Sequence, residues 1–344
     1  TEGCVMDIKQ ALGKIAENKD LTGEEMRSVM RIIMSGEATP AQIGAFLMGM
    51  RIKGETVGEI AAAVSILREQ MVPVSAPDDA IDIVGTGGDG VGSLNISTAT
   101  AIVVAGAGVA VAKHGNKALS SRSGSSQALE ALGVKLDLTP DEIGKTIAEA
   151  NIGFMFAPNH HPAMRHVGPA RAEMGVRTLF NLLGPQSNPA GVRRYLLGVY
   201  AQEWVEPVAA ALLANRATKA WVVHSSEGLD ELSTSGSNFV AQIANGDLRS
   251  FELHPEQVGL KLTDPKDLLG GEPSENAAAI EALLDGAAGA YRDTVLLNAG
   301  AALLVADKVD SIEDGIALAR DAIDSGKARQ TLARLVAVSN GRAS

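Results

Sequence analysis

The stretch DIVGTGGDGVGSLNISTATA, residues 82–101, decides the fold, because it leads from a short apolar strand through a glycine-rich loop into a helix. Its first glycines have the G-x-G-x-x-G spacing of a dinucleotide-binding turn. Such a turn has its third glycine in the first turn of the helix and an acidic residue at the end of the next strand. Here the helix begins only near Asn95, and the next strand ends in Lys113. The loop therefore predicts a phosphate-containing ligand other than a dinucleotide.

The composition indicates a cytoplasmic α/β protein. With 344 residues, 46% of them hydrophobic, the chain can bury a large core, and its many small residues suit helices packed on a parallel sheet. A net charge of −11 makes a nucleic-acid-binding surface a local exception. Cys4, the single cysteine, excludes an internal disulfide and suits a reducing compartment. No apolar run reaches the roughly 18 residues of a membrane span. We expect neither nucleic acid nor a membrane as a partner.

The first 72 residues predict a small helical domain. We expect four short helices, and capping boxes mark the starts of three of them, at Thr22, Thr39 and Thr56. Methionines at i, i+4 and i+8 would stack on one helix face: Met26, Met30 and Met34. This stripe predicts either a methionine-rich core or a subunit interface.

After a proline-containing linker at 71–79, short apolar runs alternate with stretches of helical length. The runs predict strands at 80–84, 109–113, 134–138, 152–157, 194–200 and 219–225, and a hairpin over 239–253 that turns at Asn245-Gly246. This alternation predicts a mostly parallel central sheet with helices on its faces.

Helical sequence from Pro162 to Leu183 interrupts the alternation and could pack on the N-terminal helices. The expected fold is therefore α/β, with a small all-helical domain (1–72, joined by about 170–190) and a large α/β domain (73–344 without that insertion).

Candidate ligand-binding segments gather at consecutive strand ends, where α/β proteins bind their ligands. GTGGDG and NIST follow the first strand, KHGN ends the second, and SSRSGSS opens the next helix. Glycine amides, helix N-termini and hydroxyls around Lys113 suit a polyphosphate. Each segment alone is typical of a structural turn or a helix cap, but together they favour a site. A P-loop is excluded, because no Walker lysine follows the glycines.

Adjacent carboxylates follow the predicted strand at 219–225. Asp230 and Glu231 would lie in a loop at the ligand-binding edge of the sheet, where hard oxygen ligands suit magnesium. An exposed Asp-Glu pair is otherwise typical of solvated surface.

Histidines and arginines crowd residues 159–189 and could grip an anionic or aromatic acid. Arg171 and Arg177 are six residues apart, so they would not share a helix face, and at most one should reach a given ligand. As an alternative, these arginines pair with Glu173 or cap helix ends.

Taken together, seven motifs occur in the order of one family: DIVGTGGDG, NIST, KHGN, SxSGS, HHPAMRHVGPAR, RTLFNLLGPxxNP and LDELS. The chain resembles the anthranilate phosphoribosyltransferases from about residue 7 to 338. The resemblance implies that anthranilate is joined to phosphoribosyl pyrophosphate with release of pyrophosphate, in tryptophan biosynthesis. It also implies Mg²⁺ as the cofactor and a homodimer formed through the helical domains.

The resemblance further implies a role for each matching residue, by positioning and electrostatics and without a catalytic nucleophile. Phosphoribosyl pyrophosphate would contact Gly85, Gly88, Asp89, Ser93, Asn95, Ile96, Ser97, Thr98, Lys113, Ser121 and Ser125. Anthranilate would contact Gly85, His114, Asn116, His161, Arg171 and Pro185, with Arg171 facing its carboxylate. Magnesium would be held by Ser97, Asp230 and Glu231.

A few positions depart from the pattern of the family. Lys117 stands where arginine is common after KHGN, and an arginine there would offer a bidentate fork to a phosphate. Less usual pairs also stand at Ser93-Leu94 and Gln186-Ser187, and SSQALE replaces a commoner SADVLE. Each keeps polarity or position, so these departures bear on affinity rather than on activity.

Three other functions stay open at this point. A pyrimidine nucleoside phosphorylase shares the architecture and would use phosphate and a nucleoside. A non-catalytic, nucleic-acid-binding relative should be basic, whereas this chain is acidic and has Arg171. An NADP oxidoreductase could use Lys113 on a 2′-phosphate, but the late helix start and the NIST motif argue against it.

Overall fold

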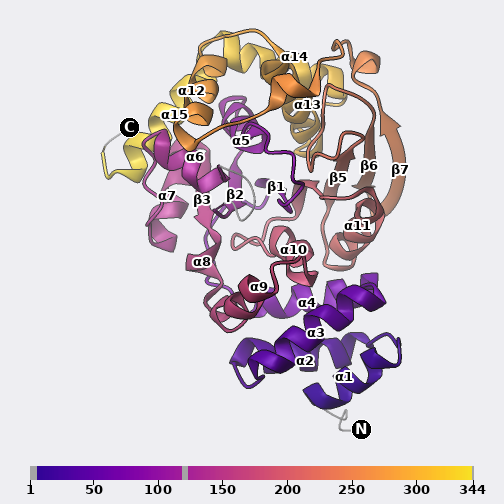
Figure 1. The fold of residues 1–344 in the computed structure, drawn as a ribbon. Helices are drawn as coiled ribbons and strands as arrows, with labels where there is room; N and C mark the ends of the chain where they lie inside the picture. The colour runs from indigo at the N-terminus through magenta and orange to yellow at the C-terminus, as the bar shows by residue number, and fades with distance from the viewer. Residues whose placement is uncertain (1–5, 118–122, 343–344) are drawn as a thin grey trace.

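A seven-stranded sheet forms the centre of the larger part of the molecule, in a computed structural model that describes residues 6–117 and 123–342 (Figure 1). Its strands are β1 (Ile81–Gly85), β2 (Val111–Gly115), β3 (Ile152–Phe156), β4 (Arg194–Gly198), β5 (Lys219–Ser225), β6 (Asn238–Ala244) and β7 (Asp247–Leu253). Their order is β3-β2-β1-β4-β5-β6-β7, with β1 to β5 parallel and the β6–β7 hairpin antiparallel. The chain adds β2 on one side of β1 and β4 on the other. The carboxyl ends of β1 and β4 therefore form the switch point where such sheets bind ligands.

Helices cover both faces of the parallel part of the sheet, which explains why β1 to β5 are almost entirely buried, whereas the edge strand β7 is largely exposed. One face packs against α5 (Ile96–Gly106) and α13 (Ala290–Val305), which contact α14 (Ile312–Asp324) and α15 (Lys327–Ser339). The shorter α6 (Ser125–Ala131) contacts α12 (Pro273–Leu284), and α7 (Pro140–Ala150) lies beside the edge strand β3. On the opposite face, α11 (Val205–Ala214) packs against β5 and β6.

The N-terminal bundle consists of α1 (Ile8–Ala16), α2 (Gly23–Ser35), α3 (Pro40–Lys53) and α4 (Val57–Gln70). The predicted capping boxes at Thr22, Thr39 and Thr56 are confirmed. The interrupting segment forms α8 (Ala157–His160), α9 (Gly168–Met174) and α10 (Leu179–Leu183), and α9 and α10 lie between the bundle and the sheet (Figure 1). α9 contacts α3, whereas α10 contacts α3 and α4. The division into domains after residue 72 stays a prediction.

Single-turn 3₁₀ helices complete the secondary structure at η1 (Pro162–His166), η2 (Gly184–Gln186), η3 (Gln202–Trp204), η4 (Pro255–Val258) and η5 (Pro265–Leu268). Of these, η1 and η2 flank α9 and α10 on the chain path from β3 to β4.

The strand predicted at 134–138 is wrong. Val134 and Leu136 are buried in the core, which explains the alternating sequence, but the segment between α6 and α7 pairs with no strand of the described sheet. The methionine stripe belongs to the core, since Met26, Met30 and Met34 are buried within a single chain. The stripe therefore gives no support for a subunit interface.

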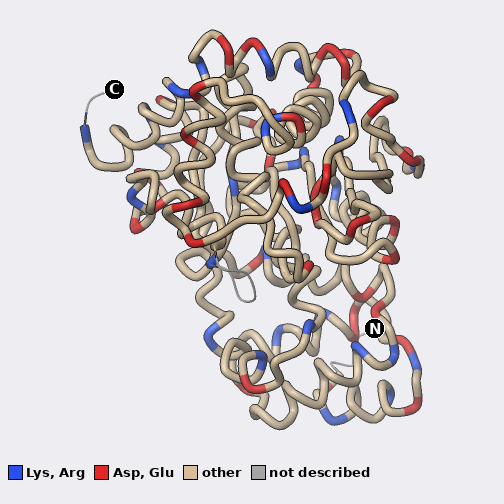
Figure 2. The backbone as a smooth tube through the Cα atoms, turned by 45° about the horizontal axis from the view of Figure 1, so that its top comes forward, with Lys and Arg blue, Asp and Glu red and all other residues tan. Residues whose placement is uncertain are grey.

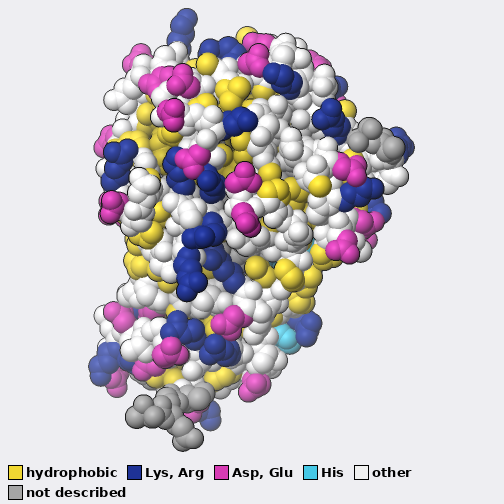
Figure 3. Space-filling view, turned by 180° about the vertical axis from the view of Figure 1, so that it is seen from behind, with side chains coloured by type: hydrophobic (Ala, Val, Ile, Leu, Met, Phe, Trp, Pro, Cys, Tyr) yellow, Lys and Arg dark blue, Asp and Glu magenta, His cyan; other side chains and the backbone are white. Residues whose placement is uncertain are grey.

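Charged residues of both signs are interspersed along the backbone of the bundle and the sheet domain (Figure 2). On the back of the molecule, Lys and Arg side chains gather toward the junction of the two parts (Figure 3). The local field near the junction is thus more positive than the net charge of −11 suggests. Among the described residues, no helix combines the length and the apolar character of a membrane span.

Candidate active site

The glycine loop after β1 lies at the switch point of the sheet. Its base is fixed, because Thr86 N donates to Gly198 O (2.9 Å) and Gly87 N donates to Asp230 Oδ2 (2.7 Å). The amides of residues 88–90 have no hydrogen-bond partner within the described ranges. Positive φ values favour glycine at four loop positions: Gly87, Gly88, Gly90 and Gly92. A loop fixed at its base with free amides at its tip can receive an anion.

Lys113, near the end of β2, is the buried cation of this region. Its side chain is 2% exposed, and its Nζ donates to Ile83 O (2.6 Å) and Ser97 Oγ (3.2 Å). Burial lowers the pKa of Lys113, and nearby carboxylates, first that of Asp82, oppose this effect. The ammonium group is thereby held between β1 and the start of α5.

Three carboxylates from two loops lie close to one another, near the glycine loop and the start of α5. Ser97 N donates to Glu231 Oε1 (2.8 Å), and Asp230 lies beside Asp89. Burial, and then the charge of Asp89, raise the pKa of Asp230 to about 7. Burial, and then the charge of Asp230, raise the pKa of Glu231 well above its usual range. A divalent cation would relieve this repulsion.

A complete protein cage for a metal is absent from the part of the chain that the structure describes, since no three His, Cys, Asp or Glu side chains form one. This arrangement fits magnesium, which keeps water and substrate phosphates among its ligands and needs only one or two carboxylates from the protein.

The start of α5 is positioned by contacts from outside the helix. The Asn95 side chain donates to Ser123 O (3.3 Å) and accepts from Asn276 Nδ2 (2.8 Å), so it does not cap the helix. Ile96 is fully buried in the core, which leaves only its backbone for a ligand. Thr98 is also buried, and its Oγ1 has no partner among the described residues.

Of the segment between β2 and α6, the structure describes residues 116–117 and 123–124. Ser125, the first residue of α6, donates from Oγ to Asn116 O (3.4 Å) just beyond β2. Ser93 forms a β-bridge with Leu269. Ser121 lies outside the described residues.

A second group of predicted residues lies between the sheet and the bundle. The rings of His114 and His161 are 5.1 Å apart, and Pro185 of η2 is buried as well. Burial lowers the pKa of His114 well below its usual range and that of His161 to about 4. Both imidazoles are therefore neutral at pH 7 and form an uncharged wall.

Arg171 of α9 has no counter-ion among the described residues. Its guanidinium lies 5.5 Å over the Phe180 ring, and it forms no hydrogen bond or ion pair with the described residues, Glu173 included. Burial lowers the pKa of Arg171. An arginine that is largely removed from water and unpaired suits an anionic ligand.

Asp82 is a structural link that the sequence analysis missed. Its carboxylate accepts from His114 N (3.1 Å) and Asn188 Nδ2 (2.7 Å), and Asn188 Nδ2 also donates to Ala112 O (2.8 Å). Burial raises the pKa of Asp82 to about 7 against the opposing charge of Lys113. Asp82 thus ties the KHGN strand end to the turn after α10. A lone aspartate in an apolar strand was the signal for it.

Arg177 is not part of α9, the helix that carries Arg171. The sequence analysis compared the positions of the two arginines as if both were on one helix. The helix α9 ends at Met174 and Gly175 has a φ of 61°, so the two arginines do not share a helix face, because Arg177 is not on the helix at all. The Nη2 of Arg177 donates to Gly88 O of the glycine loop. The glycine after Met174 was the signal that the helix stops there.

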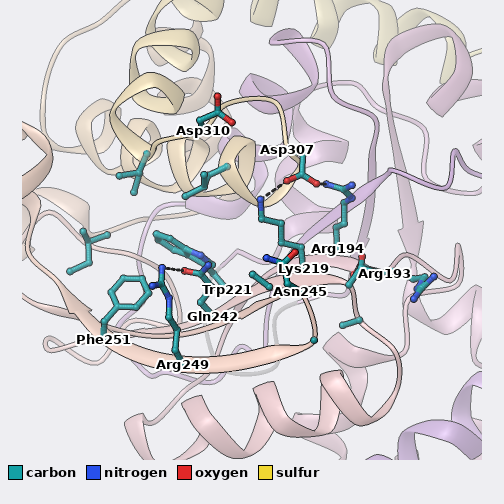
Figure 4. A pocket seen from close by; sticks show the side chains of 17 residues that line it. Arg193, Arg194, Lys219, Trp221, Gln242, Asn245, Arg249, Phe251, Asp307 and Asp310 are labelled. Carbon is teal, nitrogen blue, oxygen red and sulfur yellow. Dashed lines mark hydrogen bonds and ion pairs between the residues drawn. The ribbon is translucent and has the colours of Figure 1, made fainter.

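Two surface hollows lie apart from these residues. One, of about 930 Å³, lies at the amino ends of β4 and β5, where Asp307 pairs with Arg194 (2.6 Å) and Lys219 (2.5 Å) (Figure 4). The other, of about 1060 Å³, lies between α11 and the β6–β7 hairpin. Neither is lined by a predicted site residue, so the switch point remains the candidate active site.

The sequence is similar to two family models and to curated proteins over nearly its whole length. The sequence matches "Glycosyl transferase family, helical bundle domain" over residues 9–71 and "Glycosyl transferase family, a/b domain" over residues 77–329. Anthranilate phosphoribosyltransferase of Bradyrhizobium sp. (strain ORS 278) is 55% identical, covering 97% of this chain and 99% of the relative. That of Parvibaculum lavamentivorans is 57% identical, covering 98% of each.

Solved structures agree with these relatives. Anthranilate phosphoribosyltransferase from Thermus thermophilus superposes with a TM-score of 0.91 at 46% identity, covering 97% of this chain and 100% of the other. The enzyme from Saccharomyces cerevisiae in complex with PRPP (phosphoribosyl pyrophosphate) and Mg has a TM-score of 0.88 at 26% identity, covering 97% and 98%. The yeast enzyme in complex with 4-fluoroanthranilate has a TM-score of 0.86 at 25% identity, covering 98% and 100%.

Proposed function

The chain belongs to the anthranilate phosphoribosyltransferase family, and we propose that the glycine loop, Lys113 and the paired carboxylates form its active site. It transfers the phosphoribosyl group of phosphoribosyl pyrophosphate to the amine of anthranilate and releases pyrophosphate, in tryptophan biosynthesis. The observation that carries the site assignment is the convergence of free loop amides, a buried lysine and carboxylates of raised pKa at one switch point.

The donor would place its pyrophosphate against the glycine loop and Lys113. As the bond from ribose C1 to the pyrophosphate oxygen breaks, that oxygen keeps the electron pair, and C1 gains oxocarbenium character. Negative charge therefore grows on the leaving group. The loop amides and the Lys113 ammonium, already fixed by Ile83 O and Ser97 Oγ, would stabilise that charge without rearranging.

The acceptor needs orientation more than it needs a base. The aryl amine is neutral at pH 7, so its nitrogen lone pair forms the new bond to C1 and the surplus proton then passes to water. Arg171 would hold the carboxylate of anthranilate, while the neutral rings of His114 and His161 would line its path. This orientation brings the amine within reach of C1.

Magnesium would be held by Ser97, Asp230 and Glu231, together with the phosphates of the donor. When bound, the ion neutralises charge on the pyrophosphate as it leaves. The raised pKa values of Asp230 and Glu231 support this placement, because burial and mutual repulsion disfavour their ionised forms, which a bound cation would stabilise. The yeast relative in complex with PRPP and Mg supports the use of this cation.

A homodimer would form through the bundle. The outward face of α3 carries an apolar stripe at i, i+4, i+7 and i+11, made of Ala41, Ala45, Met48 and Ile52. Ile52 is 79% exposed in a single chain. A contiguous apolar stripe of this kind is typical of a surface that another subunit covers. The single cysteine, Cys4, fits a cytoplasmic enzyme.

The loss of anthranilate fluorescence on mixing with phosphoribosyl pyrophosphate and magnesium tests the active site. We expect loss in wild-type protein, no loss with chelator present, and a large reduction in Lys113→Met. A reaction with phosphate and a pyrimidine nucleoside in place of these substrates would count for the phosphorylase alternative. Full activity in Lys113→Met would remove the lysine from the site.

A further inference from the structure

We propose that Arg177 is a positioning residue that orients the peptide between Gly88 and Asp89, so that the Asp89 amide faces the pyrophosphate of the donor. The inference rests on the proposed active site. It gives a role to an arginine that the motif assignments leave without one.

The orientation follows from the geometry of the peptide bond. A trans peptide is planar, and its C=O and N–H point in opposite directions. Gly88 O accepts a hydrogen bond from Arg177 Nη2, so the N–H of Asp89 points away from Arg177. That amide has no partner among the described residues and is free to donate to a ligand.

The peptide needs such a restraint because glycines surround it. Gly87, Gly88 and Gly90 have φ values of 64°, 71° and 81°, in a region where glycine moves with little steric cost. The base of the loop is fixed at Gly87 by Asp230, whereas the peptide between Gly88 and Asp89 makes one hydrogen bond among the described contacts, the one from Arg177. Without Arg177 this peptide could rotate and turn a carbonyl oxygen toward the pyrophosphate.

Arg177 is itself held from two directions. Its guanidinium lies 4.6 Å over the ring of Tyr200, which follows β4. Its backbone oxygen accepts from Arg51 Nη1 of α3. The cation–π contact with the ring restrains the guanidinium, and the Arg51 contact restrains the backbone that carries it. The glycine loop is therefore linked to the helical bundle through two arginines.

The substitution Arg177→Ala tests the role by separating the two substrates. Titration calorimetry with pyrophosphate and Mg²⁺ should show binding weakened about tenfold, the scale of one charge-assisted hydrogen bond. The KM for phosphoribosyl pyrophosphate should rise by a similar factor, while the KM for anthranilate at saturating donor stays within about twofold. Arg177→Lys should recover part of the affinity, because an ammonium can donate to Gly88 O but cannot stack flat on Tyr200.

Two further variants complete the test. Arg51→Ala should weaken pyrophosphate binding in the same direction by a smaller factor. Arg249→Ala removes an equal charge from β7, where this arginine contacts the neutral Gln242, and should leave binding unchanged.

Several outcomes would overturn the role of Arg177. These are unchanged pyrophosphate binding in Arg177→Ala, an equal rise in both KM values, or a lower melting temperature with normal affinities. Wild-type protein that binds no pyrophosphate would overturn the proposed active site together with this role. The two failures are therefore distinguished by the wild-type titration.

Discussion

The side chain of Asp230 lies over Gly85, where an added Cβ would collide with Oδ2. Gly85→Ala must therefore push the carboxylate away from the Gly87 amide that it accepts from. We expect kcat/KM to fall by about a hundredfold with an unchanged circular dichroism spectrum. Gly58→Ala in α4, where a Cβ meets no atom within 4 Å, is the matched control and should keep full activity. Equal activities of the two variants would contradict the prediction.

Removal of the carboxylates of Asp230 and Glu231 should lower the activity of the protein but raise its thermal stability. In Asp230→Asn with Glu231→Gln, we expect turnover to fall by about a thousandfold and Mg²⁺-dependent pyrophosphate binding to disappear in calorimetry. The metal-free variant should melt at a higher temperature than metal-free wild type at about pH 8, because ionised forms of both groups are disfavoured in the fold. Wild-type turnover at saturating magnesium would exclude these carboxylates as ligands.

Arg171→Ala should weaken the binding of anthranilate, the acceptor substrate. A charge-assisted contact contributes about 1.5 to 3 kcal/mol, so the KM for anthranilate should rise by about ten- to a hundredfold. Steady-state kinetics at saturating donor measure this change. Arg171→Lys keeps the charge and should be intermediate, because it lacks the planar fork. An unchanged KM for anthranilate in Arg171→Ala would assign its carboxylate to another residue.

Asp82 should make the stability of the fold depend on pH. Burial raises its pKa from 3.8 to about 7, so the folded protein binds this proton more tightly than the unfolded chain. The stabilisation that protonation of Asp82 provides is present at low pH and is lost as the pH rises from about 4 to about 7. Relative to Asp82→Asn, the unfolding free energy of wild type should fall by up to about 4 kcal/mol over this range.

Urea unfolding of both proteins at several pH values between about 4 and about 8 measures this difference. The buried histidines have lowered pKa values and act in the opposite sense, but they are common to both proteins and cancel. A constant difference between the two proteins across this pH range would show that Asp82 does not titrate there.

The apolar stripe on α3 predicts the assembly. We expect wild type to have the mass of the proposed dimer and Ile52→Asp that of a monomer in light scattering after size exclusion, because a charge would be buried at the contact. Leu262→Asp, which changes a half-exposed leucine of the other domain, should leave the mass unchanged. A wild-type monomer, or an Ile52→Asp dimer, would remove α3 from the interface.

Local signals predicted most of the architecture. Capping boxes in the bundle and apolar runs in the sheet depend on neighbours a few residues away, so they were readable from the chain. The segment at 134–138 failed because alternating burial of Val134 and Leu136 resembles a strand, while pairing depends on a partner that the sequence does not specify. The family resemblance, rather than spacing, supplied the roles of the acceptor-side residues.

Contacts between distant segments were not predictable in this way. Asp82 meets Asn188 across 106 positions, and Arg177 meets Gly88 across 89, so only the folded topology brings each pair together. The spacing rule also placed Arg177 on a continuing helix, which in the structure ends before Gly175. The sequence motifs therefore identify the segments of the site, whereas hydrogen bonds between distant residues hold these segments in place.

The fixed position of Lys113 carries a cost for the folded protein. A lysine that is 2% exposed loses its water and its side-chain freedom during folding, before any substrate arrives. Ligand binding then orders nothing further at this group, which favours affinity. Lys113→Met should accordingly give a more heat-resistant protein with little transferase activity. Stability and catalysis therefore make opposite demands on this position, and the lysine is retained for the reaction.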